Sequence, residues 1–374
     1  MTAVILLIAM FRSTDSAIKK DEVVLFFPSV GRLAEDGSRW KVEISGWIFE
    51  PEADSKKRAV LLKLLRNALG LGENVVEKGT FKKRAHWFLV DNERGKRVSI
   101  QLGDKAYELE KSESNGHFRG ELTLGLDEAR RLLSGQEGLN GRLGFQAVTS
   151  EGDSRVFPGV IRLVEQTGLS IISDIDDTIK VSEVRNRKAL LLNTFSREFR
   201  AVPEMTDVYA KWAKSGARFH YLTASPWQLY EPLSSFLHTA KFPPATTFHM
   251  RNFRWRDTSS LALFSSSENY KRQRIESLIE AFPRRRFVLV GDSGEKDPEI
   301  YGAIARQHPS SVQRIFIRDV AGEDTDSARI QQAFDGVPSE KWTLFRDASE
   351  IGEVLGDSRL PDVRPPEESG SGTE

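Results

Sequence analysis

The chain has 374 residues, enough for two or three domains, and its 39% hydrophobic and 29% charged content is typical of a soluble globular protein. The formal net charge of +0 gives no global attraction for nucleic acid or an anionic membrane, so we expect no nucleic-acid partner and any basic site must be local. There are no cysteines, which excludes disulfides, thiolate metal sites and cysteine catalysis.

The N-terminal residues 1–18 form a segment of unclear role. Residues 4–10 are apolar, but the stretch is short, has no preceding Lys or Arg, and is not followed by a small-x-small cleavage site. A poor signal sequence or a misassigned start are the alternatives. No stretch is long enough to cross a bilayer as a helix. The absence of cysteines is compatible with the cytoplasm, where we expect the protein, with peripheral contact to a membrane left open.

Residues 19–165 are predicted to form a β-rich accessory domain. Residues 40–44 alternate between apolar and polar side chains, which is the period of a half-buried strand. Residues 91–95 are expected to close one hairpin, and Asn115-Gly116 gives the strongest short-range hairpin signal. Several short strands at this spacing predict a small sandwich or barrel. The other expected strands are 23–27, 87–90, 98–102, 107–109, 118–124 and 143–147, and helices are expected at 55–71 and 127–133.

Residues 166–358 are predicted to form a second domain of the α/β class. Here apolar runs alternate with helical stretches, the signature of a Rossmann-like parallel sheet. Residues 359–374, rich in Pro, Glu, Gly and Ser, are expected to be a disordered tail. The predicted strands of the sheet are 169–172, 218–222, 287–290, 315–317 and, as a fifth, 343–345.

The first of these strands is followed by an acidic stretch. Side chains two apart on an extended segment point the same way, so Asp174 and Asp176 start on one side of the strand end. Open α/β sheets bind ligands at this edge. Two carboxylates there can hold a hard cation, and one can attack phosphorus while the other moves a proton. The alternative is an Asp-rich loop in which Asp177 or Thr178 caps the next helix.

The second strand is followed by two hydroxyl side chains, Thr223 and Ser225. A hydroxyl at a strand end, followed by a helix start, can bind phosphate oxygens through its O–H group and nearby backbone N–H groups. A simple helix cap by Ser225, with Pro226 at the first helical position, is the alternative, and it shares the geometry of an anion site.

Three charged residues complete the set of candidates. Lys271 opens a predicted helix, where a cation can offset phosphate charge and position a carboxylate, although such lysines are usually solvated. Asp292 ends the strand at 287–290 and adds a carboxylate for Mg²⁺, which prefers oxygen ligands. Asp297 is expected to orient a metal-bound water or the lysine, with capping of the helix after Pro298 as the alternative.

The order of these motifs resembles the haloacid-dehalogenase-like phosphohydrolase superfamily. The resemblance is closer to the phosphatidate phosphatase catalytic-domain family, typified by the fungal actin-patch phosphatidate phosphatase. It runs over about residues 166–350, and residues 40–51 are similar to the domain that precedes the catalytic one in that family. The stretches that carry it include Asp174-Ile-Asp-Asp-Thr-Ile-Lys-Val, Thr223-Ala-Ser-Pro-Trp-Gln-Leu-Tyr and Gly291-Asp-Ser-Gly-Glu-Lys-Asp-Pro.

The resemblance implies a role for each candidate. Asp174 is expected to attack phosphorus and become an aspartyl phosphate, while Asp176 protonates the leaving alkoxide and then deprotonates the hydrolytic water. Thr223 and Lys271 are expected to hold phosphate oxygens. Asp174, Asp292 and the backbone carbonyl of Asp176 are expected to bind Mg²⁺.

The expected function is Mg²⁺-dependent hydrolysis of phosphatidate to diacylglycerol and phosphate, and the resemblance alone favours this substrate. A soluble phosphomonoester is the enzymatic alternative. A lipid- or protein-binding adaptor without turnover is the non-enzymatic one, and the intact motifs argue against it. Thr178 is expected to brace the acidic loop by a hydrogen bond, whereas the role of Asp177 stays open.

Residues 249–256 are a candidate for substrate selection. If this stretch is extended, Arg254 and Arg256 share one face and can attract an anionic headgroup, while Phe253 and Trp255 share the other. We favour the alternative, an edge strand whose aromatic side chains pack inward and whose arginines lie in water.

Overall fold

The computed structural model describes residues 18–51, 78–136, 141–252 and 268–351, together with residues 59, 60, 62, 63, 66, 67 and 70. The six described positions between 59 and 67 are helical, in agreement with the helix expected at 55–71; Gly70 lies in a turn, and the other residues of this range lie outside the described part. Residues 1–17, the proposed tail 359–374, and the candidates Arg254 and Arg256 also lie outside it. No helix among the described residues is long and apolar enough to cross a membrane.

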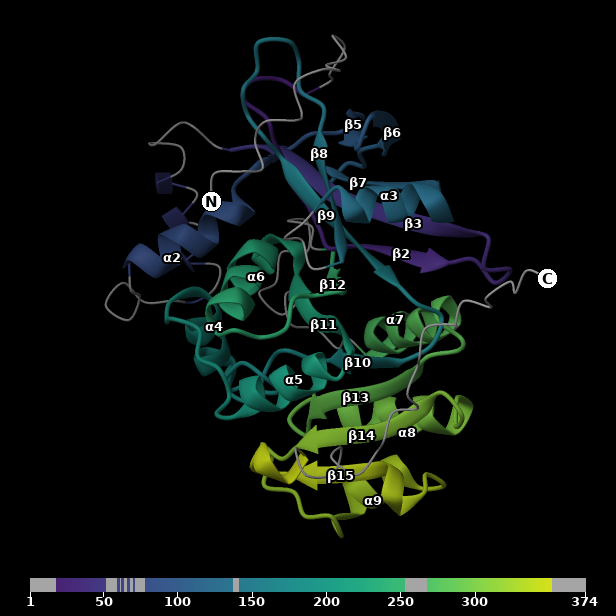
Figure 1. Cartoon of the computed structure of the whole chain (residues 1–374). Coiled ribbons are helices and arrows are strands. Elements are labelled where there is room, and N and C mark those ends of the chain that lie inside the picture. The colour runs from purple at the N-terminus through teal and green to yellow at the C-terminus, as the bar shows by residue number, and fades with distance from the viewer. Residues whose placement is uncertain are drawn as a thin grey trace, which may run out of the picture.

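The N-terminal part of the chain forms a nine-stranded sheet, which we call sheet A and which occupies the upper half of Figure 1. Its order is β1-β3-β2-β9-β8-β5-β6, with β4 and β7 also paired to β3. All pairs are antiparallel except β2 with β9. The strands are β1 (Val23–Phe26), β2 (Ser29–Leu33), β3 (Arg39–Glu50), β4 (Asp91–Asn92), β5 (Arg97–Leu102), β6 (Lys105–Lys111), β7 (His117–Gly125), β8 (Arg142–Ala147) and β9 (Pro158–Val164), and the helices are α2 (Lys78–Ala85), η1 (His86–Phe88) and α3 (Leu126–Ser134).

For this sheet, one predicted strand and two predicted hairpins were wrong, and two elements were not predicted. Residues 87–90 are not a strand: 87 and 88 lie in η1, and the short β4 that follows pairs with β3, so the predicted hairpin with 98–102 does not form. The chain turns at Gly116, which has a φ of 76°, but β6 pairs with β5 and β7 with β3. Helix α2 was not predicted. Strand β2 was not predicted either, because Gly31 interrupts its apolar pattern. Glycine is needed there, since a Cβ would lie 2.5 Å from Leu163 of β9.

The C-terminal part forms a parallel sheet of six strands, sheet B, in the order β12-β11-β10-β13-β14-β15, in the lower half of Figure 1. All five predicted strands are present, and β12 lies at the edge, where part of the stretch 249–256 was expected. The strands are β10 (Leu169–Ser173), β11 (Arg218–Pro226), β12 (Thr247–Arg251), β13 (Arg286–Asp292), β14 (Val312–Arg318) and β15 (Trp342–Phe345). The helices are α4 (Arg187–Phe195), α5 (Met205–Lys214), η2 (Trp227–Leu229), α6 (Tyr230–Thr239), α7 (Glu268–Ala281), α8 (Asp297–Gln307), α9 (Ala328–Phe334) and η4 (Ser339–Lys341).

Helices cover both faces of sheet B. Every residue of the central strand β10 is buried, as expected for a strand packed on two sides. Ile171 packs with the apolar side chains of α4, α5 and α6, whereas its neighbour Ile172 packs with those of α7, α8 and α9. The predicted fold class, a Rossmann-like parallel sheet preceded by a smaller β-rich domain, is confirmed.

The two sheets share part of one hydrophobic core. Phe27 and Trp47 of the first part belong to the same cluster of buried side chains as α4, α5 and α6. The ring of Phe27 stacks on Trp227 with centroids 4.0 Å apart and meets Tyr230 edge-on at 4.8 Å. Since Trp227 directly follows the strand end that carries Thr223 and Ser225, this contact ties sheet A to the edge where the candidate residues lie.

Candidate active site

The candidate residues lie where three parallel strands end. Strand β10 lies between β11 and β13, with Ser173 in register with Tyr221 on one side and Val290 on the other. The segments that follow therefore meet at one edge of the sheet. The backbone N–H of Asp174 donates to the Val290 carbonyl at 2.9 Å, which fixes the start of the acidic loop against β13.

Lys271 lies at the centre of a cluster of buried charges. Its Nζ atom is 2.9 Å from Asp174, 2.7 Å from Asp297 and 2.9 Å from Glu295. The side chain is only 1% exposed, so the solvated lysine that sequence statistics favoured is not what the structure contains. An ammonium group that is buried among three carboxylates is a fixed positive charge beside Asp174.

Three acids form a group that can hold a cation. Asp174, Asp292 and Asp297 are buried, and one oxygen atom of each lies within 4.8 Å of those of the others. Oδ1 of Asp292 accepts hydrogen bonds from the backbone N–H groups of Gly294 at 2.7 Å and Glu295 at 3.2 Å, whereas Oδ2 has no partner among the described residues. A buried carboxylate oxygen without a donor, next to two more acids, fits a hard cation such as Mg²⁺.

The electrostatics of this group reflect its burial. Burial raises the pKa of the Asp174 carboxyl well above its usual range, and the charge of Lys271 opposes that rise. Burial likewise raises the pKa of Asp292 and Asp297. For Lys271 burial acts in the opposite direction, but the surrounding carboxylates outweigh it and raise the pKa above the ordinary lysine value. One lysine does not neutralise all the carboxylates of this cluster, so the binding of a further cation is favoured.

The carboxylate of Asp176 faces a second group of side chains. Oδ2 accepts from Thr223 Oγ1 at 3.0 Å and from Ser225 Oγ at 3.3 Å. Oδ1 lies 2.7 Å from Lys180 Nζ and accepts from Ser182 Oγ at 2.7 Å. Burial would raise the pKa of Asp176, but Lys180 and the hydrogen bonds from Ser182 and Thr223 together outweigh it, so the pKa is lowered. Four donors around one carboxylate hold it in its ionised form.

The rest of the acidic loop braces these two aspartates. Thr178 Oγ1 donates to Asp174 Oδ2 at 3.1 Å, the kind of contact that was expected of it. Asp177 has a φ of 55°, and its carboxylate accepts the backbone N–H groups of Ser182, Glu183 and Val184 at 2.7 to 2.9 Å. Asp177 therefore folds the loop onto itself.

Two predicted alternatives were wrong. Ser225 does not cap a helix: it lies in β11, the residue before η2 is Pro226, and the Ser225 hydroxyl donates to Asp176. Asp297 does not cap α8, which it begins; its carboxylate contacts Lys271 and accepts the backbone N–H of Asp292 at 3.3 Å.

Sequence reasoning missed three residues that contact the aspartates. Lys180 and Ser182 contact the carboxylate of Asp176, and Glu295 contacts Asp292 through its backbone N–H and Lys271 through its side chain. One signal existed for Lys180: it lies four residues after Asp176, in a loop already known to be acidic. Nothing local showed that the loop turns back, because the turn depends on the left-handed backbone of Asp177.

Comparison with known proteins finds similarity to a phosphatase family over part of the chain. Residues 169–319 match the family model described as phosphatidate phosphatase APP1, catalytic domain. The chain is 33% identical over 207 residues to phosphatidate phosphatase APP1 of Saccharomyces cerevisiae, covering 54% of this chain and 32% of that protein. It is 27% identical over 184 residues to an uncharacterised protein of Schizosaccharomyces pombe, covering 48% of this chain and 30% of that one.

The chain thus spans about a third of the length of the curated relatives it matches. Among solved structures, one assigned as a HAD-like phosphatase from Mesorhizobium loti has a TM-score of 0.33 and 14% sequence identity, covering 50% of this chain and 84% of that chain. That structural likeness is weak. The resemblance to the phosphatidate phosphatase catalytic-domain family is confirmed by the family model, for residues 169–319.

Proposed function

Proceeding from the place of residues 169–319 in the phosphatidate phosphatase catalytic-domain family, we propose that this chain is a Mg²⁺-dependent phosphomonoesterase that works through an aspartyl phosphate. The observation that carries the proposal is the buried Asp174 carboxylate, held 2.9 Å from Lys271 among further buried acids. A buried cluster with unbalanced charge lowers the stability of the folded chain, and such clusters occur at functional sites.

In the first step, a carboxylate oxygen of Asp174 attacks phosphorus and the bond from phosphorus to the alcohol oxygen breaks. Asp176 gives its proton to the departing alkoxide. Lys271 holds Asp174 in place and offsets the charge of the phosphate, and Thr223 is placed to donate to a phosphate oxygen. For this step Asp176 must be protonated, which requires the Thr223 and Ser225 hydroxyls to turn away from it.

In the second step, water attacks the aspartyl phosphate and releases inorganic phosphate, restoring the Asp174 carboxylate. Asp176 takes the proton of that water. The structure supports this half of the cycle, because the four donors around Asp176 favour the ionised carboxylate that a general base needs.

Asp174, Asp292 and the backbone carbonyl of Asp176 would hold Mg²⁺, with Asp297 beside them. When bound, the cation supplies charge neutralisation for the transferring phosphoryl group. The side chain of Asp176 takes no part in that set, since it faces Lys180 and the hydroxyls of Thr223 and Ser225.

Phosphatidate is the proposed substrate and diacylglycerol the product, because the relative that shares 33% identity is a phosphatidate phosphatase. A lipid substrate requires contact with a membrane surface, so we include peripheral membrane contact of a cytoplasmic protein in the proposal. A soluble phosphomonoester is the second candidate, since the site accounts for the phosphate and not for the alcohol.

The test is phosphate release from phosphatidate in mixed micelles, beside a panel of soluble phosphomonoesters, with Mg²⁺ and with chelator. We expect chelator-sensitive turnover of phosphatidate that Asp174→Asn abolishes and that the exposed Asp207→Asn leaves intact. Activity retained by Asp174→Asn would contradict the proposal that Asp174 is the nucleophile. Activity on soluble esters alone would contradict phosphatidate as the substrate. No turnover of any compound would favour an adaptor.

A further inference from the structure

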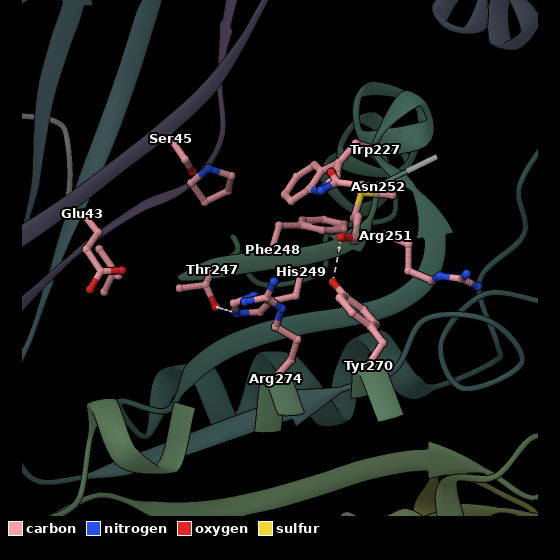
Figure 2. A pocket seen from close by; sticks show the side chains of 13 residues that line it. Glu43, Ser45, Trp227, Thr247, Phe248, His249, Arg251, Asn252, Tyr270 and Arg274 are labelled. Atoms are coloured by element: carbon pink, nitrogen blue, oxygen red, sulfur yellow. Dashed lines mark hydrogen bonds between the residues drawn. The ribbon is translucent and has the colours of Figure 1, made fainter. Parts of the chain in front are cut away.

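A cavity of about 440 Å³ lies between the two sheets (Figure 2). Three residues that line the cavity are close to candidate site residues along the chain or in the sheet. Trp227 follows Ser225 by two residues, Tyr270 precedes Lys271, and Arg251 is paired with Pro226. One wall comes from sheet A and its approach, through Pro28, Val30, Glu43 and Ser45.

A chain of buried polar side chains crosses sheet B and ends in this cavity. Arg285 Nε donates to Ser170 Oγ at 2.9 Å, and Ser170 Oγ lies 3.2 Å from His220 Nε2. His220 Nδ1 lies 2.8 Å from Thr247 Oγ1, which lies 2.8 Å from His249 Nε2. His249 lines the cavity, and Figure 2 shows its bond to Thr247 as a dashed line.

The donors and acceptors in this chain can be assigned in order. The Ser170 hydroxyl accepts from Arg285, whose guanidinium only donates, and we assign that hydroxyl as the donor to His220 Nε2. The proton of the neutral His220 ring then lies on Nδ1 and is donated to Thr247. The Thr247 hydroxyl in turn donates to His249 Nε2. The neutral His249 ring is therefore left with its proton on Nδ1, an atom that has no hydrogen-bond partner among the described residues.

This assignment requires both rings to be neutral, and the direction of both pKa shifts favours the neutral form. Burial and the nearby Arg274 lower the pKa of His249 to about 4. Burial, together with His249 and Arg285, lowers the pKa of His220 well below the ordinary value. Near neutral pH the chain thus ends in a fixed N–H donor.

The side chains around this donor define the chemistry of a ligand. Arg274, which also only donates, lies beside His249 and with its guanidinium 5.5 Å from the centre of the Tyr270 ring. The Tyr270 hydroxyl donates to the Met250 carbonyl at 2.7 Å, so it is already engaged. The acid on the sheet A wall, Glu43, accepts from Arg32 at 3.1 Å. Apolar surface comes from Trp227, Phe248 and Met250.

We propose that this cavity binds the alcohol part of the phosphomonoester, with an ester carbonyl oxygen accepting from His249 and Arg274 and the adjoining acyl carbons lying against Trp227 and Phe248. An ester carbonyl only accepts, which matches the N–H groups of His249 and Arg274 on this side of the cavity. The inference rests on the proposed function and deepens it, since it assigns the selection of an acylated alcohol to particular residues. It also makes residues of sheet A part of the substrate-binding site.

The test compares kcat/KM for dioctanoyl phosphatidate with kcat/KM for glycerol 3-phosphate in the full chain with Mg²⁺. We expect the ratio of the two to fall about tenfold in Arg274→Met and in His249→Phe. Thr247→Val should lower it less, because the His249 ring keeps its nitrogen atoms but loses the fixed proton position, and Thr247→Ser should restore it. Arg272→Met, which removes a half-exposed guanidinium from the same helix, should leave the ratio unchanged.

The outcomes separate the two proposals. A wild-type chain that hydrolyses neither substrate would contradict the proposed function. Turnover by the wild type, with an unchanged ratio in a folded Arg274→Met variant, would overturn this inference alone. Because Arg274 lies at the cavity surface and outside both hydrophobic clusters of sheet B, that variant is expected to fold even if His249→Phe does not.

Discussion

Asp292 shows how one buried carboxylate can couple cation binding to stability. One of its oxygens has no hydrogen-bond partner among the described residues, so the folded chain carries an uncompensated charge there. A cation that binds only the folded state offsets this cost and raises the melting temperature.

We therefore expect Mg²⁺ to raise the Tm of the wild type by several degrees and to leave the Tm of Asp292→Asn unmoved. Thermal unfolding with and without Mg²⁺ measures the difference directly, without reference to activity. Asp207→Asn, at an exposed position of α5, is the control and should respond like the wild type. An equal rise in Asp292→Asn would place the cation elsewhere.

Lys180 holds the proposed acid and base in position. It is 1% exposed and lies 2.7 Å from Asp176, on the side away from Thr223. We expect Lys180→Met to lower kcat/KM for an alkyl phosphate by about a hundredfold, because the alkoxide then departs without a well-placed proton donor. The loss for 2,4-dinitrophenyl phosphate should be much smaller, since that leaving group needs no proton.

The comparison of the two leaving groups distinguishes a loss of Asp176 positioning from a general disruption of the folded active site. Lys180→Arg should recover part of the activity on the alkyl phosphate, because it keeps a buried donor near Asp176. Equal losses on both esters in Lys180→Met would show that Lys180 serves only the fold.

At the scale of elements, a single side chain joins helix α2 to the end of helix α4. The buried Arg84 donates to the carbonyl oxygens of Asn193 at 3.2 Å, Thr194 at 2.9 Å and Arg197 at 2.6 Å. The last carbonyls of a helix have no partner within it, so Arg84 satisfies groups that α4 leaves open. Since α4 follows the acidic loop, this contact also supports the segment that carries Asp176.

We expect Arg84→Met to lower the free energy of unfolding by about 3 kcal/mol, because buried carbonyls lose a charged donor. Chemical denaturation of the full chain measures the change. Lys83→Met, one residue earlier on the exposed side of α2, is the matched control and should have little effect. A difference of less than about 1 kcal/mol between the two variants would mean that water replaces the guanidinium without cost.

At the scale of the whole molecule, the contact between the two sheets contains a titratable group. His117 of β7 lies among the rings of Phe27, Trp47 and Trp227, with centroids 5.5 to 5.9 Å away. Burial lowers its pKa from 6.5 to about 4. The folded pKa is below the unfolded one, so the contribution to stability is fully present above pH 6.5 and is lost as the pH falls toward 4.

We expect a fall in pH to lower the free energy of unfolding, with His117 contributing up to about 3 kcal/mol of the loss. Free energies of unfolding measured from pH 7 to pH 4 should fall less steeply in His117→Phe than in the wild type. His238→Phe, at an exposed position of α6, is the control and should follow the wild type. Parallel curves for all three proteins would contradict the buried, neutral state of His117.

The sequence by itself determined the fold class of sheet B and the types of residue at its edge. Apolar runs separated by helical stretches suffice to predict parallel strands, and Asp174, Thr223 and Asp292 each come directly after such a run. The parallel arrangement then brings them to one edge, because the carboxyl ends of neighbouring strands meet there. Sheet A was less predictable, since Gly31 packs closely against Leu163 of β9 and Trp87 packs on Trp47 and Phe49 of β3, and the local sequence does not reveal these contacts.

Only the tertiary structure decided which charges face one another. Asp174 and Asp176 lie two residues apart in an acidic loop, yet one pairs with Lys271 from α7 and the other with Lys180 from the same loop. The sequence could not distinguish these partners, because charge pairing depends on where the chain returns in space. The cavity between the sheets has the same origin, since His249 and Glu43 both line it only because the two sheets pack together.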